Sequence, residues 1–152
     1  MKKILDGRKL ANELNDKSKK EVSELKKKAG LSPTLATILV GQDPASKIYV
    51  NIKHKTCEKV GINSLMVSFP KNATKEEISD KIRELNTDEN VHGILLQIPL
   101  PEKTRNHTND LLQEINENKD VDGFHYINRG KLFYQVEELV PCTPKGIITL
   151  LE

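Results

Sequence analysis

An alternation of short apolar runs with amphipathic segments constrains the fold of this 152-residue chain more than any other feature. Thr34–Val40 is apolar on both faces, as expected of a strand that helices cover on each side. Further strand-like runs occupy residues 65–69 and 91–97, and helical patterns lie between the runs. Such an order indicates a mostly parallel sheet with right-handed crossovers. The predicted fold class is therefore α/β, with helices on both faces of the sheet in three layers.

Residue patterns also predict where the helices begin and end. Apolar residues recur at helical intervals over Gly7–Ala29, and Gly30 follows as a C-terminal cap. Ile48 and Ile52 belong to the predicted apolar face of a second helix. The other predicted end signals are Gly61, a capping box of Thr74 with Glu77, and the capping hydroxyl of Thr108.

The last residues of the chain predict the start of another helix. Thr143 offers a capping hydroxyl, and Pro144 suits the first helical position. A helix that stops after about two turns is marginal unless it is packed. We therefore expect a fragment of a longer protein, in which residues 1–143 form one domain and residues 144–152 begin a linking helix.

Composition and charge disfavour several classes of protein. The 24 Lys and Arg against 22 Asp and Glu leave a net charge of +2, which creates no field to hold nucleic acid or an anionic membrane. No apolar run is long enough to span a bilayer, and Asp6 interrupts the opening that Lys2 and Lys3 begin, so we expect a cytoplasmic protein without a signal peptide. Cys57 and Cys142 predict reduced thiols, and the four histidines show no metal-ligand spacing.

The carboxyl ends of the predicted strands are where a ligand is expected in a parallel sheet, namely at residues 41–46 and 97–101. Tyr49 and Lys53 lie four residues apart on the helix that follows the first strand, so they share one face. A tyrosine at the core edge with a solvated lysine is the structural alternative. Residues 97–101 carry two prolines and predict a stiff apolar wall with the Gln97 amide at its mouth, or simply a strand terminator.

The sequence does not contain the complete motifs of two other classes of binding site, those for dinucleotides and for calcium. The eight glycines form no G-x-G turn, so the residues present do not predict a dinucleotide cradle. Asp120 and Asp122 begin a calcium-loop-like pattern, but the remaining acidic ligands are missing, and a turn is the favoured interpretation.

Five segments together match one family in order and spacing: VGQDPAS at residues 40–46, YVNIK at 49–53, GILLQIPLP at 93–101, KDVDGF at 119–124 and PCTPKG at 141–146. On these residues the chain resembles the bifunctional methylenetetrahydrofolate dehydrogenase/methenyltetrahydrofolate cyclohydrolase, from about residue 5 to its end. The resemblance implies a catalytic domain that binds tetrahydrofolate derivatives, followed by a Rossmann domain for NADP or NAD and a final helix that returns to the first domain. It also implies a parent homodimer held through the Rossmann domain, so that this fragment is expected to be monomeric.

The resemblance also assigns roles to individual residues. Lys53 resembles the catalytic lysine, Gln97 its partner, Tyr49 the ring that packs along the folate, and Asp122 the carboxylate that binds the pterin. The other residues that the resemblance places at the folate are Ser46, Ile98, Pro99, Leu100, Pro101 and, close to the same cleft, Cys142. No metal is implied.

The implied chemistry belongs to one-carbon metabolism and purine biosynthesis. The methenyl substrate is a cation, so its charge opposes a second charge on Lys53 and favours an amine that can act as a base. We expect this base to help water add to the one-carbon bridge, giving 10-formyltetrahydrofolate, while oxidation of the methylene form needs the nicotinamide domain. The alternative is a catalytically silent folate-binding or interaction module, and a nucleic-acid module is a distant third.

Overall fold

The computed structural model describes residues 4–152, so Lys2 and Lys3 of the predicted opening lie outside the described residues. Its centre is a parallel sheet in the order β2-β1-β3. The strands are β1 (Thr34–Val40), β2 (Asn63–Phe69) and β3 (Gly93–Leu96). The second strand starts earlier than predicted because Asn63 pairs with Thr34, and the third is shorter because its pairing with β1 covers only residues 93–96.

The two faces of the sheet have different partners. The main core lies on the face that carries Ala36 and Ile38 of β1 together with Ile94 and Leu96 of β3. Helix α3 (Lys75–Thr87) supplies Ile78, Ile82 and Leu85 to this core, and α5 (Thr108–Glu114) supplies Leu111 and Leu112. Their packing buries aliphatic side chains of both helices against the sheet, which is the main source of stabilisation for such a layer.

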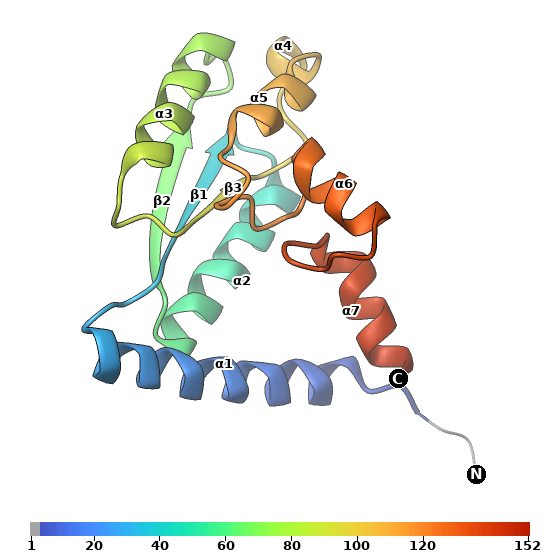
Figure 1. Ribbon diagram of the computed structural model, residues 1–152. Coiled ribbons are helices and arrows are strands. Elements are labelled where there is room, and N and C mark those ends of the chain that lie inside the picture. The colour runs from blue at the N-terminus through green and yellow to red at the C-terminus, as the bar shows by residue number, and fades with distance from the viewer. Residues whose placement is uncertain (1–3) are drawn as a thin grey trace.

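The opposite face of the sheet is covered by α2 (Pro44–Val60), and α1 (Gly7–Ala29) packs across α2 (Figure 1). This arrangement confirms the predicted α/β class with helices on both faces. The apolar positions predicted for α2 are right at Val60, which is buried, but wrong at Ile48 and Ile52, which are 60% and 56% exposed. Val50 is buried instead. Helix α2 covers only part of this face of the sheet.

The helix ends confirm part of the sequence prediction. Gly30 and Gly61 adopt left-handed backbone conformations after α1 and α2. The capping box is present, since Thr74 accepts from the backbone N–H of Glu77 and the Glu77 carboxylate accepts from the N–H of Thr74.

Two predicted caps are wrong. Thr108 is the first residue of α5, and its hydroxyl donates to the carbonyl of Arg105, at the end of α4 (Glu102–Arg105). Helix α7 (Cys142–Leu151) begins before Thr143, so Pro144 is its third residue. Proline is tolerated throughout a first turn because those N–H groups have no intrahelical partner, and its position therefore does not fix the start. The helix α6 (Tyr126–Phe133) precedes α7.

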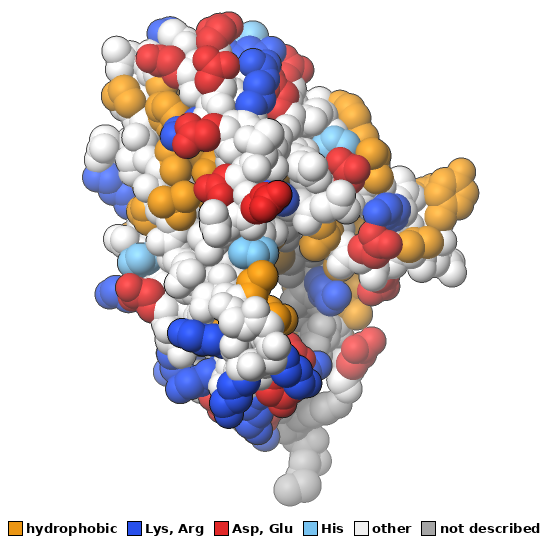
Figure 2. Space-filling model, turned by 60° about the vertical axis from the view of Figure 1, so that its left-hand side comes forward, with side chains coloured by type: hydrophobic (Ala, Val, Ile, Leu, Met, Phe, Trp, Pro, Cys, Tyr) orange, Lys and Arg blue, Asp and Glu red, His pale blue; other side chains and the backbone are white. Residues whose placement is uncertain are grey.

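Charged side chains of both signs cover the end of the molecule where α1 lies (Figure 2). Pairs at i,i+4 include Lys9–Glu13 at 4.0 Å, Lys17–Glu21 at 3.9 Å and Glu24–Lys28 at 3.6 Å. These pairs set glutamates beside lysines along the exposed surface of this helix. Over residues 4–152, no helix combines the length and the apolar character that a membrane crossing requires.

Candidate functional site

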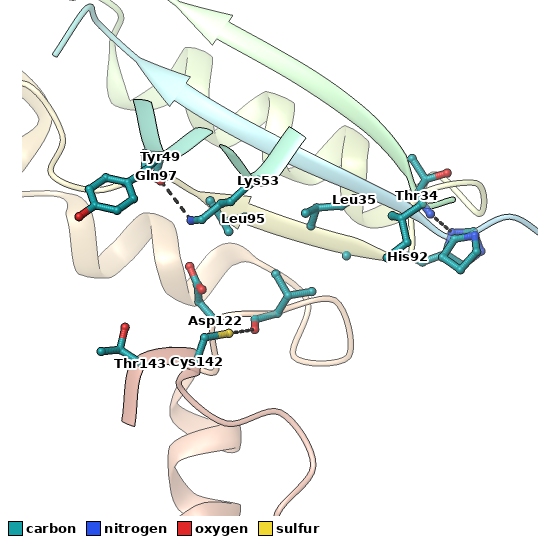
Figure 3. Close-up of a pocket in the computed structure, with 14 residues that line it drawn as sticks. Thr34, Leu35, Tyr49, Lys53, His92, Leu95, Gln97, Asp122, Cys142 and Thr143 are labelled. Carbon is teal, nitrogen blue, oxygen red and sulfur yellow. Dashed lines mark hydrogen bonds between the residues drawn. The ribbon is translucent and has the colours of Figure 1, made fainter. Parts of the chain in front are cut away.

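A cavity of about 660 Å³ lies on the sheet face that α2 leaves uncovered. Leu35 of β1 and Leu95 of β3 form its apolar floor, and Tyr49 and Lys53 of α2 form one wall. Asp122 approaches from the opposite side, together with the start of α7 (Figure 3), and Val121 also lines the cavity. Tyr49 and Gln97 lie at the end of the cavity near the carboxyl ends of the strands, and His92 lies at the other end (Figure 3).

The Lys53 ammonium and the Gln97 amide are paired in this cavity. Lys53 Nζ donates to Gln97 Oε1 at 3.2 Å (Figure 3). Gln97 Nε2 donates to the carbonyl of Ile98 at 2.7 Å. The backbone of Gln97 is itself fixed, since its N–H donates to the carbonyl of Ile38 at 2.9 Å. These contacts orient the amide oxygen toward the lysine, so the sheet determines where the amine is held.

Asp122 faces the lysine from the opposite wall (Figure 3). Burial raises the pKa of its carboxyl, the nearby Lys53 charge opposes this shift, and the Asp120 carboxylate adds to it. A half-buried carboxylate whose pKa is displaced by burial is typical of functional sites. The cavity thus presents an acceptor on one side and an amine on the other.

The sequence interpretation did not assign a role to Asp120, which holds the loop that carries Asp122. Asp120 is buried and accepts from the backbone N–H of His125 at 2.8 Å and from Asn128 Nδ2 at 2.9 Å. The loop also pairs with β3, because the N–H of Ile94 donates to the carbonyl of Lys119 at 2.7 Å. The signal was present in the D-x-D-G pattern, in which the first aspartate anchors the turn and the second is presented to the cavity.

Cys142 and Thr143 complete the wall at the start of α7. The Cys142 thiol donates to the carbonyl of Val121 at 3.6 Å (Figure 3), and burial raises its pKa. Cys57 is a buried thiol on α2, and neither cysteine is in a disulfide. The prediction of two reduced thiols is confirmed, and Cys142 lies at the cavity as the resemblance implied.

Other predicted site residues lie outside this cavity. Ser46 is 3% exposed in the first turn of α2, where its N–H donates to Asp43 at 2.7 Å. Leu100 is almost fully buried and, with Pro99 and Pro101, lines a second cavity of about 380 Å³. Ile98 separates the two cavities along the chain. The residues expected from the sequence to wall a single pocket therefore line two cavities, with Gln97 at the first and Pro99, Leu100 and Pro101 at the second.

The N-termini of α2 and α3, the helices that follow β1 and β2, are already occupied by side chains of the chain itself. A pyrophosphate needs free N–H groups at a helix N-terminus. In the first turn of α2 the Asp43 carboxylate already occupies that position, and hydrogen bonds from Ser46 lower its pKa, which keeps it anionic. The first turn of α3 is filled by its own capping box. Between residues 4 and 152, moreover, no three His, Cys, Asp or Glu side chains are placed to hold a metal ion.

The fold and the cavity together define an α/β domain with a lysine–amide pair and an opposed carboxylate over an apolar floor. The profile of the tetrahydrofolate dehydrogenase/cyclohydrolase catalytic domain matches residues 5–122. The chain is also 48% identical, over 152 residues, to the bifunctional protein FolD of Methanococcoides burtonii, covering 99% of this chain and 52% of that protein. This chain belongs to the tetrahydrofolate dehydrogenase/cyclohydrolase family.

Solved structures support this assignment. The bifunctional FolD enzyme of Campylobacter jejuni superimposes with a TM-score of 0.92 at 43% identity, over 98% of this chain and 52% of the other. The methylenetetrahydrofolate dehydrogenase of the silkworm Bombyx mori gives a TM-score of 0.94 at 35% identity, over 99% and 51%. The chain spans about half the length of the relatives it matches.

Proposed function

We propose that this chain binds a reduced folate in the larger cavity and hydrolyses the 5,10-methenyl form to the 10-formyl form. The proposal rests on the hydrogen bond from Lys53 Nζ to Gln97 Oε1, at 3.2 Å, and on Asp122, which faces this pair from the opposite wall of the cavity (Figure 3). An aspartate that accepts from a ring N–H and an exocyclic amine makes a directional contact with a pterin. Tyr49 at the cavity edge would pack along the aminobenzoyl ring.

The proposed reaction adds one water molecule to the one-carbon bridge and transfers its protons. A water attacks the electrophilic bridge carbon while the neutral Lys53 amine takes a proton from it. The hydroxyl oxygen of this adduct then gives up its remaining proton to water as the carbonyl forms, and the bond from the carbon to the N5 nitrogen breaks. N5 receives the proton that Lys53 had taken, and the carbon stays on N10 as a formyl group. Gln97 holds the amine at the bridge, so that proton transfer occurs within one preformed arrangement.

Oxidation of the methylene form is proposed for the whole protein, with NADP or NAD as the hydride acceptor. A structure of the Trypanosoma brucei relative is described as complexed with NADP cofactor and inhibitor. The chain has no G-x-G turn, and the first turns of α2 and α3 are already capped. We therefore propose that this site, and a dimer contact, belong to the half of the relatives that this chain does not match. We propose that the parent acts in cytoplasmic one-carbon metabolism.

The experiment follows the near-ultraviolet absorbance of methenyltetrahydrofolate mixed with the purified chain. We expect the Lys53→Met variant to lose at least about 100-fold of the catalysed rate, the scale of a positioned general base, while it still binds folate. Lys55→Met, which changes an exposed lysine of the same helix, is the control and should retain the rate. Equal turnover by Lys53→Met would refute the role of Lys53. Folate binding without turnover in the unmodified chain would favour the silent module.

A further inference from the structure

The buried residue of helix α6 is polar. Asn128 is almost fully buried, whereas Ile127, Leu132 and Phe133 of the same helix are exposed. A helix that packs against a domain only for stability is expected to bury its apolar residues, because the burial of apolar area is the main favourable contribution. The position of Asn128 therefore serves a polar contact rather than the core.

The Asn128 amide joins α6 to the loop that carries Asp122. Its Nδ2 donates to the carbonyl of Glu117 at 2.8 Å and to the carboxylate of Asp120 at 2.9 Å, so both of its N–H groups are used. Asp120 is itself buried, and its other donor is the backbone N–H of His125 at 2.8 Å. Without Asn128 this carboxylate would keep one hydrogen bond, which is costly for a buried charge.

Two further contacts hold the same loop against the sheet and α3. Lys119 Nζ donates to two carbonyls at the end of α3, at 2.8 and 3.0 Å. Val121 lies over Gly93 of β3, where a Cβ would be only 2.5 Å from the Val121 side chain. The three residues that precede Asp122 are therefore all fixed by the surrounding elements.

Asp122, by contrast, has no partner that fixes its own side chain. Over residues 4–152 its carboxylate accepts no hydrogen bond, and burial raises its pKa while the Lys53 charge opposes this shift. Burial disfavours the charged form, so a carboxylate on a loosely held loop would turn toward water. It nevertheless faces Lys53 across the cavity (Figure 3). Its orientation therefore depends on the residues that hold the loop.

We propose that Asn128 is a positioning residue for the pterin, which acts through Asp120 to keep the Asp122 carboxylate facing the ligand. This inference rests on the proposed function, since it concerns the same ligand. Asn128 does not line the cavity, so it has no contact of its own with a folate bound there. A group that is already held in its binding orientation binds more tightly, because little ordering remains to be done when the ligand arrives.

A double-mutant cycle tests this role, with the affinity for 5-formyltetrahydrofolate measured by calorimetric titration of the full chain. We expect Asn128→Ala to weaken binding about 5- to 50-fold, a range typical of coupling within one hydrogen-bond network. In the Asp122→Asn background the same substitution should weaken binding less than about 2-fold, because the group that Asn128 positions has lost its charge. A merely structural role would give the same loss in both backgrounds.

Two other variants complete the cycle. Asn128→Ser retains one donor and should give an intermediate loss, and it replaces the alanine variant in the cycle if the latter does not fold. Asn109→Ala is the matched control, because Asn109 of α5 also contacts α6, through the hydroxyl of Tyr126, but does not reach the loop. This control should keep the full affinity.

A measurement without folate separates this inference from the proposed function. The pKa of Asp122, followed by NMR titration of the carboxyl carbon, should fall in Asn128→Ala toward its ordinary value of 3.8, because a loosened loop lets water reach the carboxylate. An unchanged pKa, or equal losses of affinity in the two backgrounds, would overturn the positioning role. Failure of the unmodified chain to bind the folate would overturn the proposed function, and the pKa would still decide whether Asn128 positions Asp122.

Discussion

Asp122 occupies a position in the cavity wall at which burial disfavours the charged form of its carboxyl. Burial raises the pKa of its carboxyl, and the opposing attraction of Lys53 is the smaller effect. A residue placed only for stability would be expected at a site where water or a hydrogen-bond donor favours its charge. The buried network of Asp120, His125 and Asn128 nevertheless keeps the loop against β3. Such a compromise between stability and binding is characteristic of ligand sites.

The Asp122→Asn variant tests this compromise through pH. The folded state binds a proton at Asp122 more tightly than the unfolded state, whose pKa is near 3.8, so the wild-type chain loses stability as pH rises through the raised pKa. The asparagine variant lacks this loss. Its thermal midpoint relative to wild type should therefore increase as the pH rises above about 3.8, and it should level off once Asp122 is ionised in the folded state as well.

Folate affinity should change in the opposite sense in the same variant. The amide cannot supply a charged acceptor to the pterin, and we expect roughly 10- to 100-fold weaker binding at pH 7, the scale of a hydrogen bond to a charged group. Scanning calorimetry and ligand titration would measure the two effects. A midpoint difference independent of pH would show that the carboxyl of Asp122 is not penalised by burial.

At the scale of elements, the connection from the Asp122 loop to α7 depends on close backbone approach. Gly123 has φ of 65°, and a Cβ at this position would lie 2.8 Å from the carbonyl oxygen of Leu139 and 2.9 Å from the carbonyl carbon of Val140. These are main-chain atoms and cannot rotate away. The segment before α7 is thus fixed against the loop that presents Asp122.

We expect Gly123→Ala to destabilise the chain by about 1–3 kcal/mol, because it combines left-handed strain with a backbone clash. Gly130 lies within α6, and a Cβ added there would meet open space rather than another part of the chain. Gly130→Ala is the matched control and should stabilise by about 0.5–1 kcal/mol through helix propensity. Urea unfolding would measure both. A loss of stability in both variants would indicate a general intolerance of alanine in this region.

The sequence predicted the helices and strands better than it predicted how the expected site residues are divided between two cavities. Repetition of apolar residues and the capping signals of Gly30, Gly61 and Thr74 identified the sheet and three helices, because these are local properties. The exposure of Ile48 and Ile52 could not be predicted, since their periodicity does not show which side of α2 has a neighbour. The placement of Pro99 and Leu100 beside a second cavity depends on how the chain leaves β3, which no local pattern encodes.

At the scale of the whole molecule, α1 and the sheet differ in how they are held. Residues 36–40 of β1 are buried between the two helical layers. Helix α1 contains no buried residue among its 23 and rests on α2, where Val22 packs close to Gly61. Its hydrogen bonds are therefore supported mainly by local pairs and caps, and little apolar burial opposes its opening.

Hydrogen exchange should separate these two parts of the molecule. We expect the amides of α1 to exchange at least about 100-fold faster than those of residues 36–40, because local opening of α1 exposes little surface. A bound folate should slow exchange in α2 and in residues 119–124, which line the cavity, and should leave α1 unchanged. Mass-spectrometric exchange with and without 5-formyltetrahydrofolate would show both effects. Protection of α1 equal to that of β1 would mean that the helix opens only with the whole domain, and that its contact with α2 stabilises the fold far more than its exposure indicates.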